Sequence, residues 1–320
     1  MNVVVTGAGG YLGRRVVRQL REAGHHVRAV LRAAPGDTAA AGRSAARGAR
    51  PSGVGVAPLT GALRGVEMAV ADVRDRAALE RALEGAEAVV HLVAVIRERG
   101  GATFHTVNVE GTRNVVAAAE RQGVRRIVHV SALGVRDDPH LRYVYSKWLG
   151  EQAVRESRLQ WTVLRPSVMF GEGFGFLDRI VQSLRMTPPP FVPLPAGGRT
   201  RFQPIAADDV ARCIVASLAD EAHAGRVYEL GGPERLTYRE ILERVMEALG
   251  LRRLPVPVPV WLMRPVVPVM ARLLPDPPVT ADELAQLAFD NVTDPDSVRR
   301  AFGFEPLAMT TDAIAYLRDA

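Results

Sequence analysis

A glycine-rich loop that follows an apolar strand constrains the fold of this chain more than any other feature. The strand spans residues 2–5, the loop reads Thr-Gly-Ala-Gly-Gly-Tyr-Leu-Gly over residues 6–13, and an amphipathic helical pattern continues to Gly24. A second apolar strand, residues 27–31, follows at the spacing of a βαβ unit. Glycines here let the chain turn tightly and let the backbone approach a pyrophosphate. The pattern therefore predicts an α/β fold with a doubly wound parallel sheet that binds a dinucleotide.

The 320 residues suffice for a Rossmann-type domain with a smaller, interleaved C-terminal substrate lobe. The Rossmann domain is expected over residues 1–166, with a flexible insertion at 33–65 that is rich in Ala, Gly, Arg, Ser and Pro. Residues 203–230 are expected to return to its sheet, with a strand near 203–205. The lobe, for substrate or for docking, then consists of 167–202 and 231–320, with helices at 237–249, 260–274, 281–288 and 309–318.

The second strand ends without the carboxylate that an NAD site uses to bind the ribose hydroxyls. It ends at Leu31-Arg32, so we interpret Arg32 as a clamp for the 2′-phosphate of NADP(H), which makes NAD(H) the less favoured cofactor. A solvated arginine is the alternative role. The other expected dinucleotide contacts lie in the glycine loop and after the third and fourth strands: Gly7, Gly10, Tyr11, Leu12, Gly13, Asp72, Val73, Leu92, Val93 and Ala94.

Only one of the 41 basic residues is a lysine, Lys147, and it stands four residues after Tyr143. On a helix this spacing places both side chains on one face. Tyr143 is the expected general acid/base, and the Lys147 ammonium is expected to lower its pKa and to hold the nicotinamide ribose. Ser131, after the fifth strand, is expected to orient the reacting group, while Tyr145 is expected to pack. A leftover solvated lysine is the alternative for Lys147.

These residues together resemble an extended or atypical short-chain dehydrogenase/reductase. The glycine loop, Ser131, Tyr143 and Lys147 match that superfamily up to about residue 170. Later segments, such as Arg-Phe-Gln-Pro-Ile at 201–205, resemble bacterial relatives of the nucleotide-binding accessory subunit of respiratory complex I. The insertion at 33–65 departs from the short loop of that family.

The resemblance implies further roles. Residues from Pro166 to Met169, Val168 among them, would border the nicotinamide, and Asn108 would support the helix that carries the tyrosine. It also implies an alternative function, because the accessory subunit of complex I is regarded as a structural binder of NADPH. The chain would then be a non-catalytic accessory or assembly subunit, associated peripherally with a respiratory complex of the membrane.

Charge and composition exclude other classes. The net charge is +6, but the arginines are interleaved with acids and aromatics are only 6%, so we expect no nucleic-acid partner. The single cysteine, Cys213, excludes an internal disulfide and fits a cytoplasmic protein, as does the lack of an export-signal pattern. The histidines show no metal-ligand spacing, so no metal site is expected. Glu151 is expected to form a surface ion pair on its helix.

The substrate is expected to be a small apolar molecule, because the lobe carries apolar loop residues: Met169, Phe170 and Phe202. Core packing is the alternative for each of them. The most membrane-like segment, 254–274, holds five prolines and two arginines, so we expect a lobe surface or docking face rather than a spanning helix. Two functions stay open: an NAD(P)-dependent oxidoreductase or epimerase, and the non-catalytic NADPH-binding subunit.

The first prediction concerns the cofactor. Burying a 2′-phosphate requires a cation, so the chain should bind NADPH more tightly than NADH, and Arg32→Ala should weaken NADPH binding specifically. Titration of wild type and variant with both dinucleotides measures this. Equal affinity for NADH and NADPH in the wild type, or an unchanged NADPH affinity in the variant, would contradict the clamp.

Overall fold

The computed structural model describes residues 1–32, 63–173, 175–273 and 279–318. The chain divides into two compact units, Met1–Arg165 with Val210–Tyr228, and Pro166–Asp209 with Glu229–Ala320. Most of the insertion predicted at 33–65 lies outside the described residues.

The first unit is built on a seven-stranded sheet with the order β11-β6-β5-β4-β1-β2-β3. Strands β1 to β6 pair in parallel, and the order reverses at β1, which pairs with both β2 and β4. The predicted doubly wound, Rossmann-type sheet is therefore confirmed. Its strands are β1 (Asn2–Thr6), β2 (His26–Leu31), β3 (Glu67–Val70), β4 (Ala88–His91), β5 (Arg126–Val130), β6 (Gln160–Pro166) and β11 (Arg226–Leu230).

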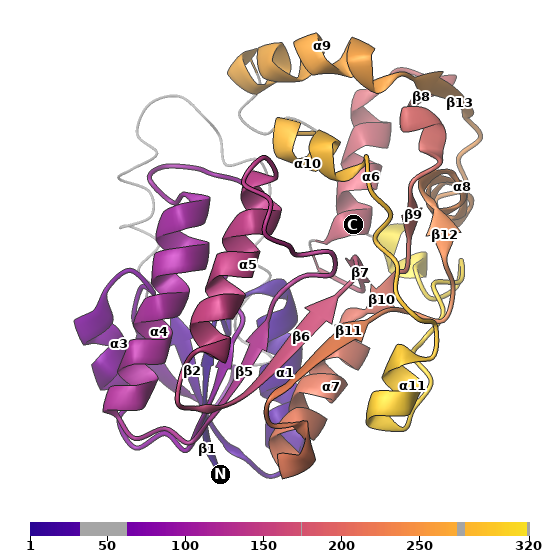
Figure 1. Cartoon of the computed structure of the whole chain (residues 1–320). Helices are drawn as coiled ribbons and strands as arrows, with labels where there is room; N and C mark the ends of the chain where they lie inside the picture. Colours follow the sequence, from indigo (N-terminus) through magenta and orange to yellow (C-terminus); the bar gives the residue numbers. More distant parts are fainter. Residues whose placement is uncertain (33–62, 174, 274–278, 319–320) are drawn as a thin grey trace. The chain divides into compact units, whose positions relative to one another are not determined.

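Helices cover both faces of this sheet (Figure 1). On one side lie α3 (Arg76–Ala82), α4 (Glu110–Arg121) and α5 (Arg142–Arg155); on the other lie α1 (Tyr11–Glu22) and α7 (Ala207–Ala219). Strands of a sheet covered on both faces are mostly apolar, and every residue of β4 and β5 is buried, including His91, Arg126 and His129. The π-helix η1 (Phe104–Val109) leads directly into α4, and the 3₁₀ turn η3 spans Glu221–His223.

The second unit contains three two-stranded sheets and several helices. Its sheets pair β7 (Met169–Phe170) with β10 (Ile205–Ala206), β9 (Arg201–Phe202) with β12 (Leu236–Thr237), and β8 (Phe191–Pro195) with β13 (Leu254–Val258). Its helices are α6 (Phe176–Met186), α8 (Tyr238–Ala248), α9 (Val260–Leu273), α10 (Ala281–Gln286) and α11 (Ser297–Phe302), with 3₁₀ turns η2 (Ala196–Gly198) and η4 (Ala315–Arg318). None of the helices in the described ranges is both long enough and apolar enough to cross a membrane.

Two local predictions for this part of the chain are wrong. The strand expected near 203–205 does not join the main sheet, because the backbone of Ile205–Ala206 pairs with β7 instead. The buried Gln203 side chain bonds the backbones of Gly232 and Thr293, at 2.7 and 2.8 Å. The helix expected at 309–318 is only the 3₁₀ turn η4. There the amides of Ala315 and Leu317 donate to the carbonyls three residues before them, those of Asp312 and Ile314, which is the 3₁₀ pattern and not the α-helical one.

The second prediction concerns Gly150, where α5 meets η1. A Cβ on Gly150 would lie 2.5 Å from the carbonyl oxygen of Asn108. Alanine is favoured over glycine in a helix by about 1 kcal/mol, whereas overpacking costs about 1–3 kcal/mol. We therefore expect Gly150→Ala to lower the free energy of unfolding by up to about 2 kcal/mol in urea denaturation. Gln152→Ala, on the same helix, is the control and should change it by less than about 0.5 kcal/mol. A stabilised Gly150→Ala would contradict the close approach.

Candidate functional site

The glycine loop after β1 has the geometry of a phosphate cradle. Gly7 has φ of +77°, and a Cβ on Gly13 would lie 2.2 Å from the Gly7 carbonyl oxygen. A side chain at either position would therefore be strained or would clash. Gly10 is the N-cap of α1, and no side chain caps this end of the helix. The backbone amides of the first turn, where Tyr11 and Leu12 lie, can thus face an anion, which fits the pyrophosphate of a dinucleotide.

The fourth strand ends against this loop. A Cβ on Gly7 would lie 3.2 Å from Cγ2 of Val93, so the two predicted contact residues are brought together. Leu92 and Val93 are half-buried and Ala94 is exposed. All of them follow β4 directly, at the edge of the sheet where the strand order reverses.

Two arginines, Arg32 and Arg74, lie near the ends of β2 and β3. Arg32 is exposed immediately after β2, and Asp72 follows β3. Asp72 pairs with Arg74 through bonds of 2.9 and 2.7 Å, and this partner, with a smaller effect of Arg32, lowers the pKa of the carboxyl group. Sequence reasoning missed Arg74. Val73 is buried, and its carbonyl accepts a hydrogen bond from Asn114, which makes it a packing residue in this structure.

Asn108 links the segment after β4 to the helix that carries Tyr143 and Lys147. Its buried amide bonds both the amide and the carbonyl of Val95, at 2.8 and 3.0 Å. It also donates to the Ser146 hydroxyl at 3.0 Å, and that hydroxyl donates to the Tyr143 carbonyl at 2.7 Å. Asn108 therefore positions α5.

Ser131 and Lys147 meet at the end of β5. Lys147 is only 3% exposed, and its Nζ donates to the Val130 carbonyl at 2.8 Å. Burial lowers the pKa of the ammonium to about 8, opposed by the charge of Glu151. Ser131, the next residue after Val130, is 5% exposed, and its Oγ is buried with no hydrogen-bond partner among the described residues. An unpartnered buried hydroxyl is costly, so this atom is available for a ligand.

Tyr143 differs from the sequence-based expectation. Its ring packs edge-on against Phe104, with the centroids 5.7 Å apart, and burial raises its pKa to about 12. The expected lowering by Lys147 is wrong for this structure, because burial dominates and the ammonium is bonded to a backbone carbonyl. The phenol is therefore protonated at neutral pH. Tyr145 stacks on Trp148 at 5.9 Å, the packing role expected of it.

The sequence suggested that Glu151 lies at the surface, but the structure buries it. It is fully buried, and its carboxylate binds Arg165 through two bonds of 2.9 and 2.7 Å, with Arg155 at 3.6 Å. The ion pair exists, but its main partner comes from β6 and not from the same helix. Helical spacing alone offered no signal for this contact.

Two buried histidines beside Lys147 were also missed. His91 and His129 are paired across β4 and β5, and their rings stack with the centroids 5.2 Å apart. His91 bonds the hydroxyls of Thr6 and Thr112, at 2.8 and 3.1 Å. Neither ring nitrogen of His129 has a partner within the described residues. Burial, then the Lys147 charge, lowers the pKa of His91 to about 3 and that of His129 well below its ordinary value.

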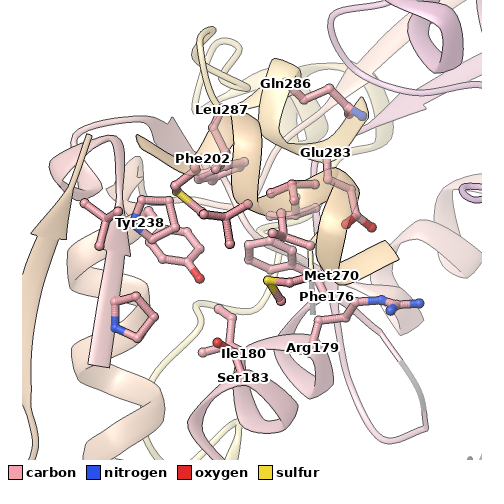
Figure 2. A pocket seen from close by; sticks show the side chains of 18 of the residues that line it. Phe176, Arg179, Ile180, Ser183, Phe202, Tyr238, Met270, Glu283, Gln286 and Leu287 are labelled. Atoms are coloured by element: carbon pink, nitrogen blue, oxygen red, sulfur yellow. The ribbon is translucent and has the colours of Figure 1, made fainter. Parts of the chain in front are cut away.

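The remaining predicted residues belong to the second unit. Pro166 ends β6 and Met169 begins β7. Phe170 is 2% exposed in the core of this unit, so packing is its role here. Val168 and Phe202 line a cavity of about 470 Å³ (Figure 2).

A sequence model of the NAD dependent epimerase/dehydratase family matches residues 3–231. The chain belongs to this family. Among its relatives is the mitochondrial 40 kDa subunit of NADH-ubiquinone oxidoreductase from Neurospora crassa, 28% identical over 261 residues, which are 81% of this chain and 68% of that subunit. Subunit 9 of the mitochondrial NADH dehydrogenase (ubiquinone) 1 alpha subcomplex of Arabidopsis thaliana is 32% identical over 243 residues, 75% of this chain and 56% of that subunit.

Solved structures of epimerases share the fold. UDP-glucose 4-epimerase of Thermus thermophilus, in complex with NAD, superimposes with a TM-score of 0.68 at 22% identity, covering 100% of this chain and 98% of that chain. The predicted resemblance to short-chain dehydrogenases and to relatives of a complex I accessory subunit is thus confirmed.

The third prediction concerns the pH dependence of stability that arises from the two buried histidines, His91 and His129. Both are neutral when folded, whereas unfolded histidines protonate near pH 6.5, so their stabilising contribution is present above pH 6.5 and is lost as pH falls toward 3. Each histidine should lower the free energy of unfolding by about 2 kcal/mol between pH 7 and pH 5. His129→Leu removes one such group and no side-chain hydrogen bond to any residue that the structure describes. Its unfolding free energy should be close to that of the wild type at pH 7 and should fall less steeply in acid.

His91→Leu is the matched comparison. It removes the same titration but leaves Thr6 without its His91 partner, which should cost about 1–3 kcal/mol already at pH 7. Denaturant unfolding of both variants at pH 5, 6 and 7 measures this. An unchanged pH dependence in His129→Leu would show that His129 is not neutral in the folded protein.

Proposed function

We propose that this protein is an NADP(H)-dependent oxidoreductase or epimerase of the short-chain dehydrogenase/reductase type. Its substrate is a small apolar molecule with a carbonyl or hydroxyl group. The observation that carries the proposal is the buried Ser131 Oγ, which has no hydrogen-bond partner in the described part of the chain and directly follows Val130, whose carbonyl binds Lys147. Family membership supports it. We place the protein in the cytoplasm.

The chain's own groups have distinct roles in this proposal. Ser131 donates a hydrogen bond to the reacting oxygen of the substrate and orients it. Tyr143, which keeps its proton at neutral pH, donates that proton as the oxygen becomes a hydroxyl. Lys147 is a compact cation with three donors, so it can bind a ribose hydroxyl while still bonding the Val130 carbonyl. The dinucleotide, when bound, supplies or accepts the hydride at its nicotinamide C4.

The choice of NADP(H) over NAD(H) rests on the ends of β2 and β3. Arg32 follows β2 where an NAD site would have a carboxylate. The carboxylate of Asp72 is already bound by Arg74, so it offers little repulsion to a phosphate. Two guanidinium groups near one carboxylate therefore favour a phosphorylated ribose.

A second function is favoured by the relatives. The two mitochondrial relatives are named as subunits of NADH-ubiquinone oxidoreductase and NADH dehydrogenase. In the alternative proposal this chain binds NADPH without turnover, as an accessory or assembly subunit at the periphery of a membrane respiratory complex. The dinucleotide then stabilises the folded chain and is not consumed.

The fourth prediction separates the two functions. Tyr143→Phe removes the proton donor and should lower the rate of substrate-dependent NADPH oxidation about 10² to 10⁴-fold while leaving NADPH affinity nearly unchanged. Lys147→Arg keeps the charge but changes shape and donor geometry, and it should impair both turnover and affinity. Tyr145→Phe is the matched control on the same helix and should retain full activity, since Tyr145 only stacks on Trp148.

The measurement is NADPH oxidation with a panel of apolar ketones and enones and of nucleotide sugars, alongside NADPH titration of each variant. A wild type that binds NADPH but turns over none of the panel would favour the accessory-subunit function. Tyr143→Phe with wild-type activity on a true substrate would contradict the assignment of the proton donor.

A further inference from the structure

The second unit contains a cavity of about 470 Å³ to which the roles proposed for Ser131, Tyr143 and Lys147 assign no ligand. Its walls come from α6, α9 and α10 together with β8, β9 and β13 (Figure 2). This volume lies within the range of small-molecule sites, about 300–1,000 Å³.

The walls are suited to a neutral, apolar ligand. Of the 19 lining residues, 14 are apolar, among them Phe176, Ile180, Phe202 and Met270. The lining holds one cation, Arg179, and one anion, Glu283, so its formal charges cancel. A nucleoside diphosphate would bring several negative charges to one guanidinium within apolar walls, which is unfavourable.

Tyr238 provides a hydrogen-bonding group within these walls. It is the first residue of α8, and Figure 2 shows its phenol directed toward the space bordered by Ile180 and Met270. Burial raises its pKa to about 12, so the hydroxyl stays protonated and can donate. A ligand oxygen placed there would accept this bond, as would one near the hydroxyl of Ser183.

The cavity opens along α9. Leu262 and Val266 both line it and are 47% and 48% exposed, so they form its edge. Next to Leu262 on the same helix, Trp261 is 72% exposed. An apolar molecule that approaches this edge therefore meets apolar side chains before it enters, which favours lipid-like ligands over polar metabolites.

We propose that this cavity binds a neutral lipid-like molecule, an acyl or isoprenoid chain that carries one hydroxyl or carbonyl oxygen. The chain lies among the apolar side chains of α6 and α9, and the oxygen accepts a hydrogen bond from Tyr238. This site goes beyond hydride transfer, and it stands whether or not Ser131, Tyr143 and Lys147 catalyse a reaction.

The test is a displacement assay on the full chain without dinucleotide, with Nile red as the reporter and 1-dodecanol and farnesol as the competitors. Both should displace the dye, and the stronger one identifies the acyl or the isoprenoid source. Leu262→Arg places a charge at the edge of the cavity and should weaken binding about tenfold or more. Val269→Arg is the matched control on the exposed side of α9 and should stay within about twofold of wild type.

Tyr238→Phe keeps the ring and removes the hydroxyl. It should weaken the binding of 1-dodecanol about three- to tenfold and leave the displacement of Nile red by dodecane unchanged. Circular dichroism verifies that each variant is folded. Equal losses of binding affinity in Leu262→Arg and Val269→Arg would overturn the site. So would a failure of both alcohols to displace Nile red. Dodecanoate or UDP competing as well as 1-dodecanol would overturn the neutral ligand class. Because no NADPH is present, failure here is distinct from failure of the proposed reductase.

Discussion

Parallel pairing of β1 with both β2 and β4 is the constraint on which the candidate site depends. The central residues Val3, Val4 and Val5 are buried, so the strand cannot shift register without exposing apolar surface. Because the strand order reverses at β1, the loops that follow its neighbours diverge and leave a crevice at the carboxyl ends. The glycine loop lies at this crevice, and the close approach of Gly7 to Val93 shows how little space the turn has.

Near the carboxyl ends of these strands one buried carboxylate, Glu151, partly compensates the cations Lys147 and Arg165. Lys147 is buried, which is unfavourable for an ammonium, but it has the Val130 carbonyl as a partner and the field of Glu151 as compensation. Glu151 is in turn held by Arg165. Burial, and to a smaller extent the Lys147 ammonium, lowers the pKa of both stacked histidines and keeps them neutral. Within the described part of the chain, the Ser131 hydroxyl is left without a partner at the end of β5.

The family model matches most of the first unit and ends before residues 232–320 of the second unit. The match covers residues 3–231, which include nearly all of the seven-stranded sheet and the glycine loop. Most of the walls of the cavity, including those from α9 and α10, lie beyond residue 231. The lining of the cavity therefore comes both from the matched residues and from the segment that follows them.

The sequence by itself determined the doubly wound sheet, the glycine loop and the helix that carries Tyr143 and Lys147. These follow from local patterns, because strand and helix periodicity and the need for glycine at a tight turn are encoded by neighbouring residues. Only the tertiary structure decided the burial of Glu151, the stacking of His91 on His129 and the cross-linking role of Gln203. Each depends on a partner from another strand or segment. The register that brings such partners together is set by packing over the whole sheet, which no local pattern records.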